Sequence, residues 1–417
     1  MTVKKDTTKA WNKVKIKDFG TVSTGTTPST KKEEYYGGAY KLISPSDLTD
    51  SKYITTAHKF ISDEGLKVSR TLPKNSVLVG CIGNVGKIGI TTDEISTFNQ
   101  QINAVVCNDN FDADFVYYLL RYNRPLLESK AAKVTLPILN KNNFENIEFD
   151  VPELSEQKLI AKTLSSVQDA IMGQEELIAK LKDLKQCMMQ QLFTHGTKGE
   201  KTKITEIGEI PESWKLVELK EIISSLAAGV SVNSYDRAIK DGEYGILKTS
   251  CVTLGIFDSR QNKAVIEKEV ARLATPLKSD TIVISRMNTP ELVGANAYVK
   301  NGNPLLFLPD RLWQIELKDY NKHSMRWIAY YLQLMWQKGI FADISSGTSA
   351  SMKNITKARL LGLTVGVASF DEQSSIALRL EAIDVRLEVV QEKLSNYQNL
   401  FKTLLHELLS RKRKIAK

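Results

Sequence analysis

The chain has 417 residues, 42% of them apolar and 25% charged, which is the composition of a globular protein of two or three domains. Its apolar runs are too short to span a membrane and its first residues contain no signal-peptide core, so we expect a cytoplasmic protein without a membrane partner. The net charge of +9 favours a polyanionic partner such as a nucleic acid.

The first segment, residues 1–153, alternates short apolar runs with Gly, Asn, Asp and Pro. One example is Asn75–Ile90, NSVLVGCIGNVGKIGI, a pattern that indicates strands joined by turns. An aromatic-rich helical stretch, FVYYLLRY, begins at Phe115. We interpret this segment as an α+β domain.

A long helix is expected next, over residues 154–195. The stretch Val151–Ile171, VPELSEQKLIAKTLSSVQDAI, starts as a loop with a proline and becomes helical at Ser155. Its apolar residues recur in alternating steps of four and three, which is the seam of a coiled coil. A helix of about 40 residues is ~60 Å long.

The rest of the chain repeats this order. Residues 196–213 are polar and contain glycine, which predicts a linker. Residues 214–368 again alternate strand and turn patterns and contain an aromatic helix, MRWIAYYLQLMW, from Met325. A second long helix is expected over residues 369–412.

The two long helices match when the first is shifted by 216 residues (373 minus 157), which aligns Gln157 with Gln373. Under this shift Gln174 falls on Val390 and Lys185 on Phe401, the two positions where only the first copy breaks the seam. The matched seam residues are Ile160, Leu164, Val167 and Ile171 in the first copy and Ile376, Leu380, Ile383 and Leu387 in the second. The sequence therefore predicts two pseudo-equivalent halves.

The helices are expected to pair antiparallel. An 18-residue linker, Gly196–Ser213, spans about 60 Å when fully extended. A parallel pair would stretch it to that limit, whereas an antiparallel pair needs only a slack connection. The predicted fold class is α+β: two domains joined by two long antiparallel coiled-coil helices in a pseudo-twofold repeat.

Motifs for catalysis are incomplete. In Gly80–Gly89, GCIGNVGKIG, the glycine spacing and the Ile after Lys87 do not fit a phosphate-binding loop. The stretch Pro309–Lys318, PDRLWQIELK, resembles a nuclease metal motif, but Asp310 and Glu316 are too close in sequence to lie on neighbouring strands. The cysteines form no CxxC pair and the histidines no HExxH pair. We therefore expect no catalytic residues, cofactor or metal in this chain.

The chain resembles the specificity subunit of type I restriction-modification enzymes. Three features support this: the Pro-x-Leu-x-Glu-Gln start of the first helix, the segment Glu206–Ile222, EIGEIPESWKLVELKEI, and the duplicated layout. Gly25–Leu48 and Ser96–Val105 are also similar to segments of that family's target recognition domains. The second helix start, GVASFDEQ, departs from the pattern because it lacks the proline.

This resemblance implies a DNA-reading subunit without catalysis of its own. Residues 1–153 and 214–368 would be target recognition domains, each reading one half of a bipartite asymmetric site in double-stranded DNA. The helices would set the half-site spacing and dock two methyltransferase (modification) subunits, which use S-adenosylmethionine. Two restriction (motor-nuclease) subunits, using ATP and magnesium, would complete a site-specific deoxyribonuclease and adenine DNA methyltransferase.

Polar residues in the predicted loops are the candidates for DNA contacts, because bases are read by polar side chains. In the first domain they are Thr26, Thr27, Ser44, Asn84, Lys87, Asn99 and Gln100. In the second they are Ser231, Asn233, Arg237, Lys248, Thr249, Arg286 and Asn288. The two sets share almost no local sequence, as expected for domains that read different bases.

Two other functions remain open at this point. One is a cryptic metal-dependent DNA endonuclease that uses Asp310, and the other is a coiled-coil structural adaptor whose end domains bind proteins. The basic charge favours DNA over protein partners, and salt-dependent DNA binding would distinguish the adaptor from a DNA reader.

Overall fold

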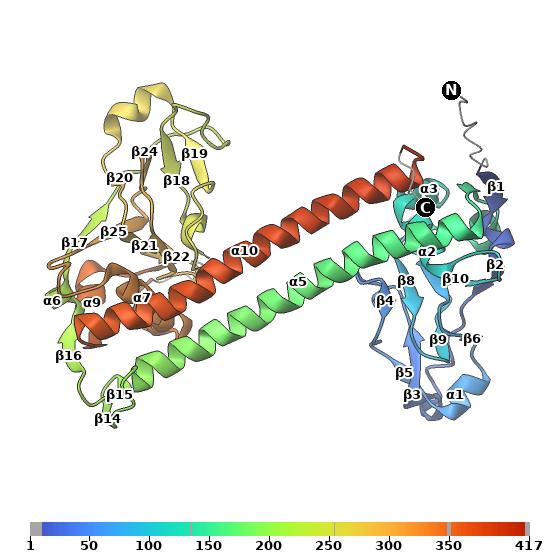
Figure 1. Cartoon of the computed structure of the whole chain (residues 1–417), viewed down its shortest axis with the longest axis horizontal. Coiled ribbons are helices and arrows are strands. Elements are labelled where there is room, and N and C mark those ends of the chain that lie inside the picture. The colour runs from blue at the N-terminus through green and yellow to red at the C-terminus, as the bar shows by residue number, and fades with distance from the viewer. Residues whose placement is uncertain (1–10, 134–135, 254, 348–351, 413–417) are drawn as a thin grey trace, which may run out of the picture. The chain divides into compact units, whose positions relative to one another are not determined.

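The computed structural model of the protein describes residues 11–133, 136–253, 255–347 and 352–412. The chain divides into two compact units: unit 1 comprises Met1–Glu176 and Gln391–Lys417, and unit 2 comprises Leu177–Val390. Each unit contains one α+β domain and a part of each of two long helices (Figure 1).

The domain of unit 1 is built on two sheets, with strand orders β2-β10-β7-β8-β4 and β5-β3-β9-β6. The strands are Gly20–Thr24 (β2), Tyr36–Ile43 (β3), Tyr53–Ile54 (β4), Phe60–Ile61 (β5), Thr71–Leu72 (β6), Val77–Gly80 (β7), Ile88–Thr91 (β8), Ser96–Phe98 (β9) and Ile102–Cys107 (β10). Around them lie Asn12–Lys15 (β1) paired with Glu148–Val151 (β13), Ala132–Lys133 (β11) paired with Pro137–Ile138 (β12), the α-helices Asp63–Lys67 (α1), Ala113–Tyr122 (α2), Arg124–Ser129 (α3) and Lys141–Glu145 (α4), and the 3-10 helices Ile16–Asp18 (η1) and Glu33–Tyr35 (η2).

The core of unit 1 lies between the larger sheet and α2. Strand β7 is buried along its whole length, which explains its continuous apolar sequence. Helix α2 begins where the side chain of Asp112 accepts a hydrogen bond from the Phe115 N–H (2.9 Å), and it buries six consecutive residues from Phe115 onward. The aromatic stretch noted in the sequence is therefore the helix that covers the sheet.

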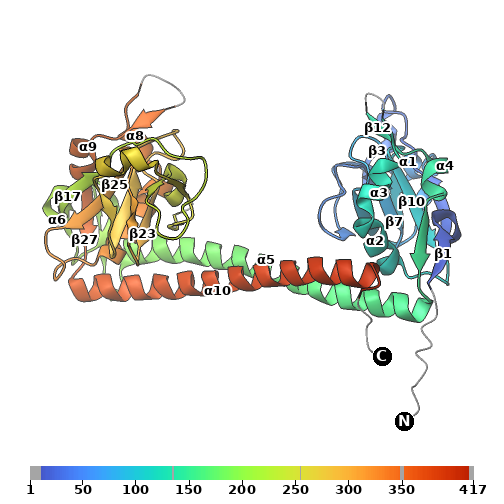
Figure 2. The same cartoon turned by 90° about the horizontal axis from the view of Figure 1, so that it is seen from above.

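The domain of unit 2 repeats this plan (Figure 2). Its sheets have the orders β17-β25-β21-β23 and β19-β18-β24-β20. The strands are Ile223–Ala228 (β17), Gly245–Leu247 (β18), Asn262–Ala264 (β19), Pro276–Leu277 (β20), Thr281–Ser285 (β21), Asn296–Val299 (β23), Asn303–Phe307 (β24) and Leu312–Leu317 (β25). Around them lie Lys215–Glu218 (β16) paired with Thr364–Val367 (β27), Met287–Asn288 (β22) paired with Lys353–Asn354 (β26), the α-helices Leu219–Ile222 (α6), Met325–Gln337 (α7), Ile340–Asp343 (α8) and Lys357–Leu361 (α9), and the 3-10 helices Thr249–Val252 (η3) and Glu267–Arg272 (η4).

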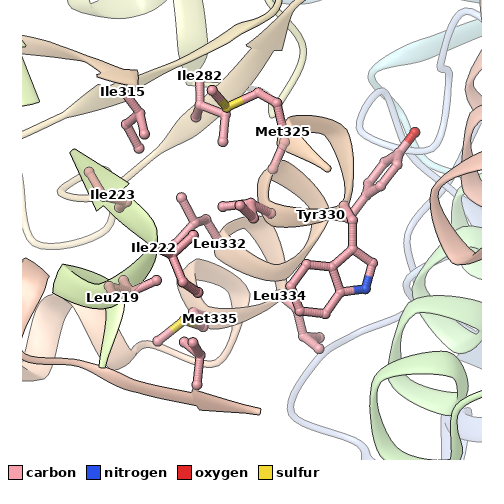
Figure 3. Close-up of a cluster of buried hydrophobic side chains, with 14 of the residues drawn as sticks. Leu219, Ile222, Ile223, Ile282, Ile315, Met325, Tyr330, Leu332, Leu334 and Met335 are labelled. Carbon is pink, nitrogen blue, oxygen red and sulfur yellow. The ribbon is translucent and has the colours of Figure 1, made fainter. Parts of the chain in front are cut away.

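Helix α7 occupies the place in unit 2 that α2 occupies in unit 1. Met325, Leu332 and Met335 lie in one apolar cluster with Ile222 and Ile282 from the surrounding elements (Figure 3). The central strands also correspond, because β2-β10-β7 and β17-β25-β21 are both antiparallel. The second sheet of each domain contains one parallel pair of strands, which is β3 with β9 in unit 1 and β18 with β24 in unit 2. The predicted duplicated α+β fold is confirmed.

The long helices are Leu154–His195 (α5) and Phe370–Leu409 (α10). Within unit 2 they run antiparallel, because Lys185 of α5 pairs with Asp384 of α10, while Thr197, just after α5, binds Glu372 in the first turn of α10. Within unit 1 the start of α5 shares a core with the end of α10, including Leu408. The predicted antiparallel pairing is confirmed.

The seam residues differ in one respect from a simple coiled coil. Ile160 and Leu164 are buried in the core of the unit 1 domain, and Ile376 and Leu380 in that of the unit 2 domain. The start of each helix therefore packs on its own domain as well as on the other helix. A heptad pattern indicates that one face of a helix is buried, but it does not indicate whether another helix or a domain core covers that face.

The segment 196–213, expected to be a slack linker, is folded. It forms a hairpin of Thr202–Thr205 (β14) and Gly208–Pro211 (β15), with Ile210 buried in the core of unit 2. Thr202 and Ile204 before the turn and Ile210 after it alternate with polar residues, and Gly208 stands at the turn. This pattern favours a hairpin over a flexible chain. Across the described ranges, no helix has an apolar stretch long enough to cross a membrane.

Candidate nucleic-acid interface

Two loops of unit 1 meet at one end of the larger sheet. Gly25–Thr27 follows β2, and Asn99–Gln101 precedes β10. The Thr26 N–H donates to the Phe98 carbonyl (2.9 Å), and the Thr27 hydroxyl donates to the Gln100 side-chain carbonyl. A Cβ at Gly25 would lie 2.2 Å from the Asn99 carbonyl oxygen, so the close approach of the loops requires glycine there.

The other predicted residues of unit 1 border these loops. The Asn99 N–H donates to Ile43 O (2.9 Å), which places Ser44 beside the cluster. The Cys81 N–H donates to Gln101 O (2.8 Å), which ties in the β7–β8 loop with Asn84 and Lys87. The structure thus gathers at this end all seven residues proposed from the first domain. Asn84 and Gln100 are exposed, whereas Lys87 and Asn99 are half-buried.

One of the seven, Ser44, has a structural partner. Its hydroxyl donates to Asp47 (2.7 Å), whose carboxylate also accepts from His58. Burial would raise the pKa of Asp47, but these hydrogen bonds outweigh it and hold the pKa below its ordinary value. Arg70 is a cation that the sequence did not reveal, and its main-chain N–H donates to the Thr26 hydroxyl (2.9 Å).

Unit 2 builds the same arrangement from different residues. Gly229–Ser231 follows β17 and Pro309–Arg311 precedes β25. A Cβ at Gly229 would lie 1.5 Å from the Leu308 carbonyl oxygen, and the Ser231 hydroxyl donates to the Asp310 carboxylate. Ser231 and Asp310 therefore stand in unit 2 where Thr27 and Gln100 stand in unit 1.

Basic residues flank this arrangement in unit 2. The Arg286 N–H donates to the Arg311 carbonyl (3.0 Å), and the Arg286 guanidinium lies 5.6 Å from the centre of the Trp313 ring. Asn288 pairs with Lys353 across β22 and β26. Ser231, Arg286 and Asn288, all proposed from the sequence, are thus brought together, whereas Arg311 and Lys353 were missed.

The remaining proposed residues of unit 2 lie differently. Lys248 follows β18, whose parallel neighbour β24 leads into the Asp310 loop, and Thr249 begins η3. Asn233 donates to Glu269 (3.0 Å), and Arg237 makes a two-pronged contact with Glu243. That guanidinium lowers the pKa of Glu243 to about 2. Asn233 and Arg237 already have acidic partners, which competes with any contact to DNA.

Each domain is attached to its long helix by a buried glutamine. In unit 1 the Gln157 carbonyl accepts from the Asp112 N–H (3.0 Å), and its amide donates to Asn110 O (3.3 Å) and Pro152 O (2.9 Å). The side chain is 1% exposed. Asp112 is the N-cap of α2, so Gln157 joins the start of α5 to the start of α2.

Gln373 repeats this contact in unit 2. It accepts from the Ser324 N–H (2.9 Å) at the start of α7, and it donates to Lys322 O (3.3 Å) and Ala368 O (2.9 Å). It is fully buried. The Glu-Gln pair recurs in the sequence because both helices use the glutamine for the same attachment.

A cation adds a second attachment in each unit, and it is buried in unit 1 and half-buried in unit 2. Lys52 lies 2.8 Å from Asp114 and 2.9 Å from the Ser165 hydroxyl of α5. Burial would lower the pKa of Lys52, but the Asp114 carboxylate raises it above its ordinary value. In unit 2, Arg326 of α7 lies 3.0 Å from Glu381 of α10. These contacts fix how each domain sits on the helix that follows it.

The acidic pair that resembled a nuclease motif does not form a site. Asp310 accepts from Ser231, whereas Glu316, near the other end of β25, accepts from Ser225 (2.9 Å) and pairs with Lys278. Within the described residues, no three His, Cys, Asp or Glu side chains are placed to hold a metal ion.

Comparison with known proteins extends this picture. A family model described as the type I restriction modification DNA specificity domain matches residues 8–183 and 211–396. The chain is 27% identical over 415 residues to the type I restriction enzyme MjaVIII specificity subunit of Methanocaldococcus jannaschii, covering 96% of this chain and 92% of that protein.

Two solved structures share the fold. The type I restriction-modification system S subunit from M. genitalium matches with a TM-score of 0.66 at 17% identity, covering 99% of both chains. A structure described for complex assembly and conformational transition of the type I R-M system matches with a TM-score of 0.54 at 14% identity, covering 96% of this chain and 97% of that one.

Proposed function

The chain belongs to the type I restriction modification DNA specificity family, and we propose that each of its two units reads one half of a bipartite, asymmetric DNA site. The supporting observation is the repeated loop arrangement with different side chains. Thr27 and Gln100 in unit 1 correspond to Ser231 and Asp310 in unit 2. A constant backbone with variable polar residues is what two readers of different sequences require.

The charged residues support a DNA partner. Arg70 and Lys87 border the unit 1 loops, and Arg286, Arg311 and Lys353 border those of unit 2. Cations beside the reading loops neutralise phosphates and fix the register of the domain on the duplex. The net charge of +9 also favours binding to the negatively charged DNA backbone.

The catalytic steps belong to partner subunits in this proposal. Two methyltransferase subunits bind along α5 and α10 and use S-adenosylmethionine, and two restriction subunits use ATP and magnesium. The chain itself holds no cofactor, carries out no chemistry and acts in the cytoplasm. The adaptor alternative has no specific observation in its favour, and the separate partners of Asp310 and Glu316 speak against the nuclease.

Sequencing of methylated adenines in host DNA, with and without this gene, tests the proposal. We expect a bipartite, non-palindromic methylated site that disappears with the gene. A methylation pattern that is unchanged by the deletion would contradict the proposal.

A biochemical test complements it. The purified assembly should bind DNA with an affinity that falls steeply with salt, whereas the pure chain should neither methylate nor cleave DNA. Metal-dependent cleavage by the pure chain that Asp310→Ala abolishes would favour the nuclease instead.

A further inference from the structure

Asp310 is an acidic side chain among the basic residues of the unit 2 loops. Arg311 follows it directly in the chain, and the Arg311 carbonyl accepts a hydrogen bond from the Arg286 N–H. One carboxylate oxygen of Asp310 accepts from the Ser231 hydroxyl, which orients the group and leaves the second oxygen as an acceptor. The side chain is half-buried, so its position is defined by the loop around it.

A carboxylate on a DNA-binding surface can make few favourable contacts with the duplex. It cannot contact a phosphate, because like charges repel. It can accept a hydrogen bond from an exposed amino group in the major groove, which is cytosine N4 or adenine N6. Of these, the cytosine amino group is the usual partner of Asp and Glu.

The corresponding residue of unit 1 has the opposite character. The side-chain carbonyl of Gln100 accepts from Thr27, so its amide nitrogen is left to donate. A donor at this place suits the acceptors on a base edge, such as guanine O6 and N7 or adenine N7. The equivalent hydroxyls of Thr27 and Ser231 therefore orient side chains of opposite kind: Gln100 offers a hydrogen-bond donor, whereas Asp310 offers an acceptor.

Resting on the proposed DNA-reading function, we infer that Asp310 and Gln100 are equivalent base-reading residues of opposite polarity. Asp310 accepts from an amino group, cytosine N4 first, in the half-site read by unit 2. Gln100 donates to an acceptor in the half-site read by unit 1. Ser231 and Thr27 are positioning residues that orient these two side chains.

The test is the methylated sequence produced by the full assembly with Asp310→Asn, an isosteric change. We expect the preferred base to change at one base pair of one half-site, from cytosine toward adenine, because an amide suits adenine N6 and N7. Discrimination in favour of the original base should fall roughly tenfold or more. Gln100→Glu should change one base pair in the other half-site.

Glu316→Gln is the matched control, since it makes the same carboxylate-to-amide change at the far end of the same strand. It should leave the methylated sequence unaltered, which separates base reading from the loss of a negative charge. If Asp310→Asn methylates no DNA, Ser231→Ala serves instead. It keeps the carboxylate and should weaken discrimination at that base pair without shifting the preferred base.

Two results would overturn the inference. One is an active Asp310→Asn assembly, or an active Ser231→Ala assembly, that keeps the wild-type sequence with full discrimination. The other is a change in both half-sites from a single substitution. Neither result affects the proposed function, which fails only if the wild-type chain directs no methylation at all.

Discussion

The ammonium nitrogen of Lys185 on α5 lies 2.7 Å from a carboxylate oxygen of Asp384 on α10. It also lies 5.2 Å from the centre of the Tyr330 ring, whose hydroxyl donates to the same carboxylate (2.6 Å). Burial and that carboxylate raise the pKa of Tyr330. Lys185, which looked like a defect in the seam, therefore has a charged partner in unit 2.

At the corresponding positions of unit 1, two uncharged side chains replace this ion pair. Under the shift of 216 residues (384 minus 168), Gln168 takes the place of Asp384 and Phe401 that of Lys185. The Tyr118 hydroxyl donates to Gln168 (3.0 Å), and its ring lies 6.0 Å from that of Phe401. The two halves share a backbone plan but differ in which side chains can meet at this junction.

This difference bears on a fragment of residues 1–196. We predict that the fragment forms a homodimer that reads a palindromic site, because a second copy of α5 can replace α10. Lys185 of one copy would then face Gln168 of the other, without a carboxylate. Gln168→Asp should therefore tighten the dimer by about tenfold or more. Sedimentation measures this, and a fragment that stays monomeric with and without the substitution and the methyltransferase would refute it.

In the full chain, Lys185→Met should lower the free energy of unfolding by about 2 kcal/mol, since it leaves the half-buried carboxylate of Asp384 without a positively charged partner. The double change Lys185→Phe with Asp384→Gln copies the side chains of unit 1 and should recover most of that loss. Urea unfolding of the three proteins decides the matter. Equal destabilisation by the single and double changes would show that the ion pair is unimportant.

Gln157→Leu and Gln373→Leu should each lower the free energy of unfolding by about 1–3 kcal/mol, because each leaves a buried N–H and carbonyls without partners. Gln191→Leu, at an exposed position of α5, is the control and should change little. Thermal or urea unfolding provides the measurement. A loss no larger than that of Gln191→Leu would mean that the glutamines do not hold the domains.

The stability of unit 2 should depend on pH through Glu372. Burial would raise the pKa of Glu372, but the Thr197 N–H and Lys198 outweigh it and hold the pKa below its ordinary value of 4.5. A lowered pKa stabilises the fold at higher pH, and this stabilisation is lost as the pH falls through the folded-state value. Glu372→Gln should therefore be destabilising at pH 7, with a difference that shrinks in acid.

The exposed Glu156 is the matched control for that experiment, since it precedes Gln157 as Glu372 precedes Gln373. Glu156→Gln should show no comparable pH dependence. Urea unfolding between pH 7 and 3 gives both curves. A difference between wild type and Glu372→Gln that is constant over this range would contradict the assignment.

The sequence was sufficient for the features that repeat. The heptad pattern and the 216-residue offset predicted both long helices and the duplicated α+β plan, because burial imposes a period on a helix. Thr26, Asn99 and Gln100 were selected as polar residues in turn-rich segments, and the structure places them in neighbouring loops. These are local signals.

Contacts between residues far apart in the chain could not be predicted from such local signals. Thr27 and Gln100 are 73 residues apart, and Ser231 and Asp310 are 79 apart. Asp310 was considered only as part of a local acidic motif, so its partner in a distant loop was missed. The hairpin at 202–211 was missed because its polar composition resembles that of a linker, although Ile210 is buried.

The attachment through Gln157 and Gln373 has a consequence for how new specificities arise. Each glutamine binds only main-chain N–H and carbonyl groups, so the contact requires a correctly shaped domain but no particular side chains in it. As far as this contact is concerned, genetic recombination can replace a recognition domain by one of unrelated sequence without a change at either glutamine, whereas the contacts of Lys52 with Ser165 and of Arg326 with Glu381 would have to be kept or replaced.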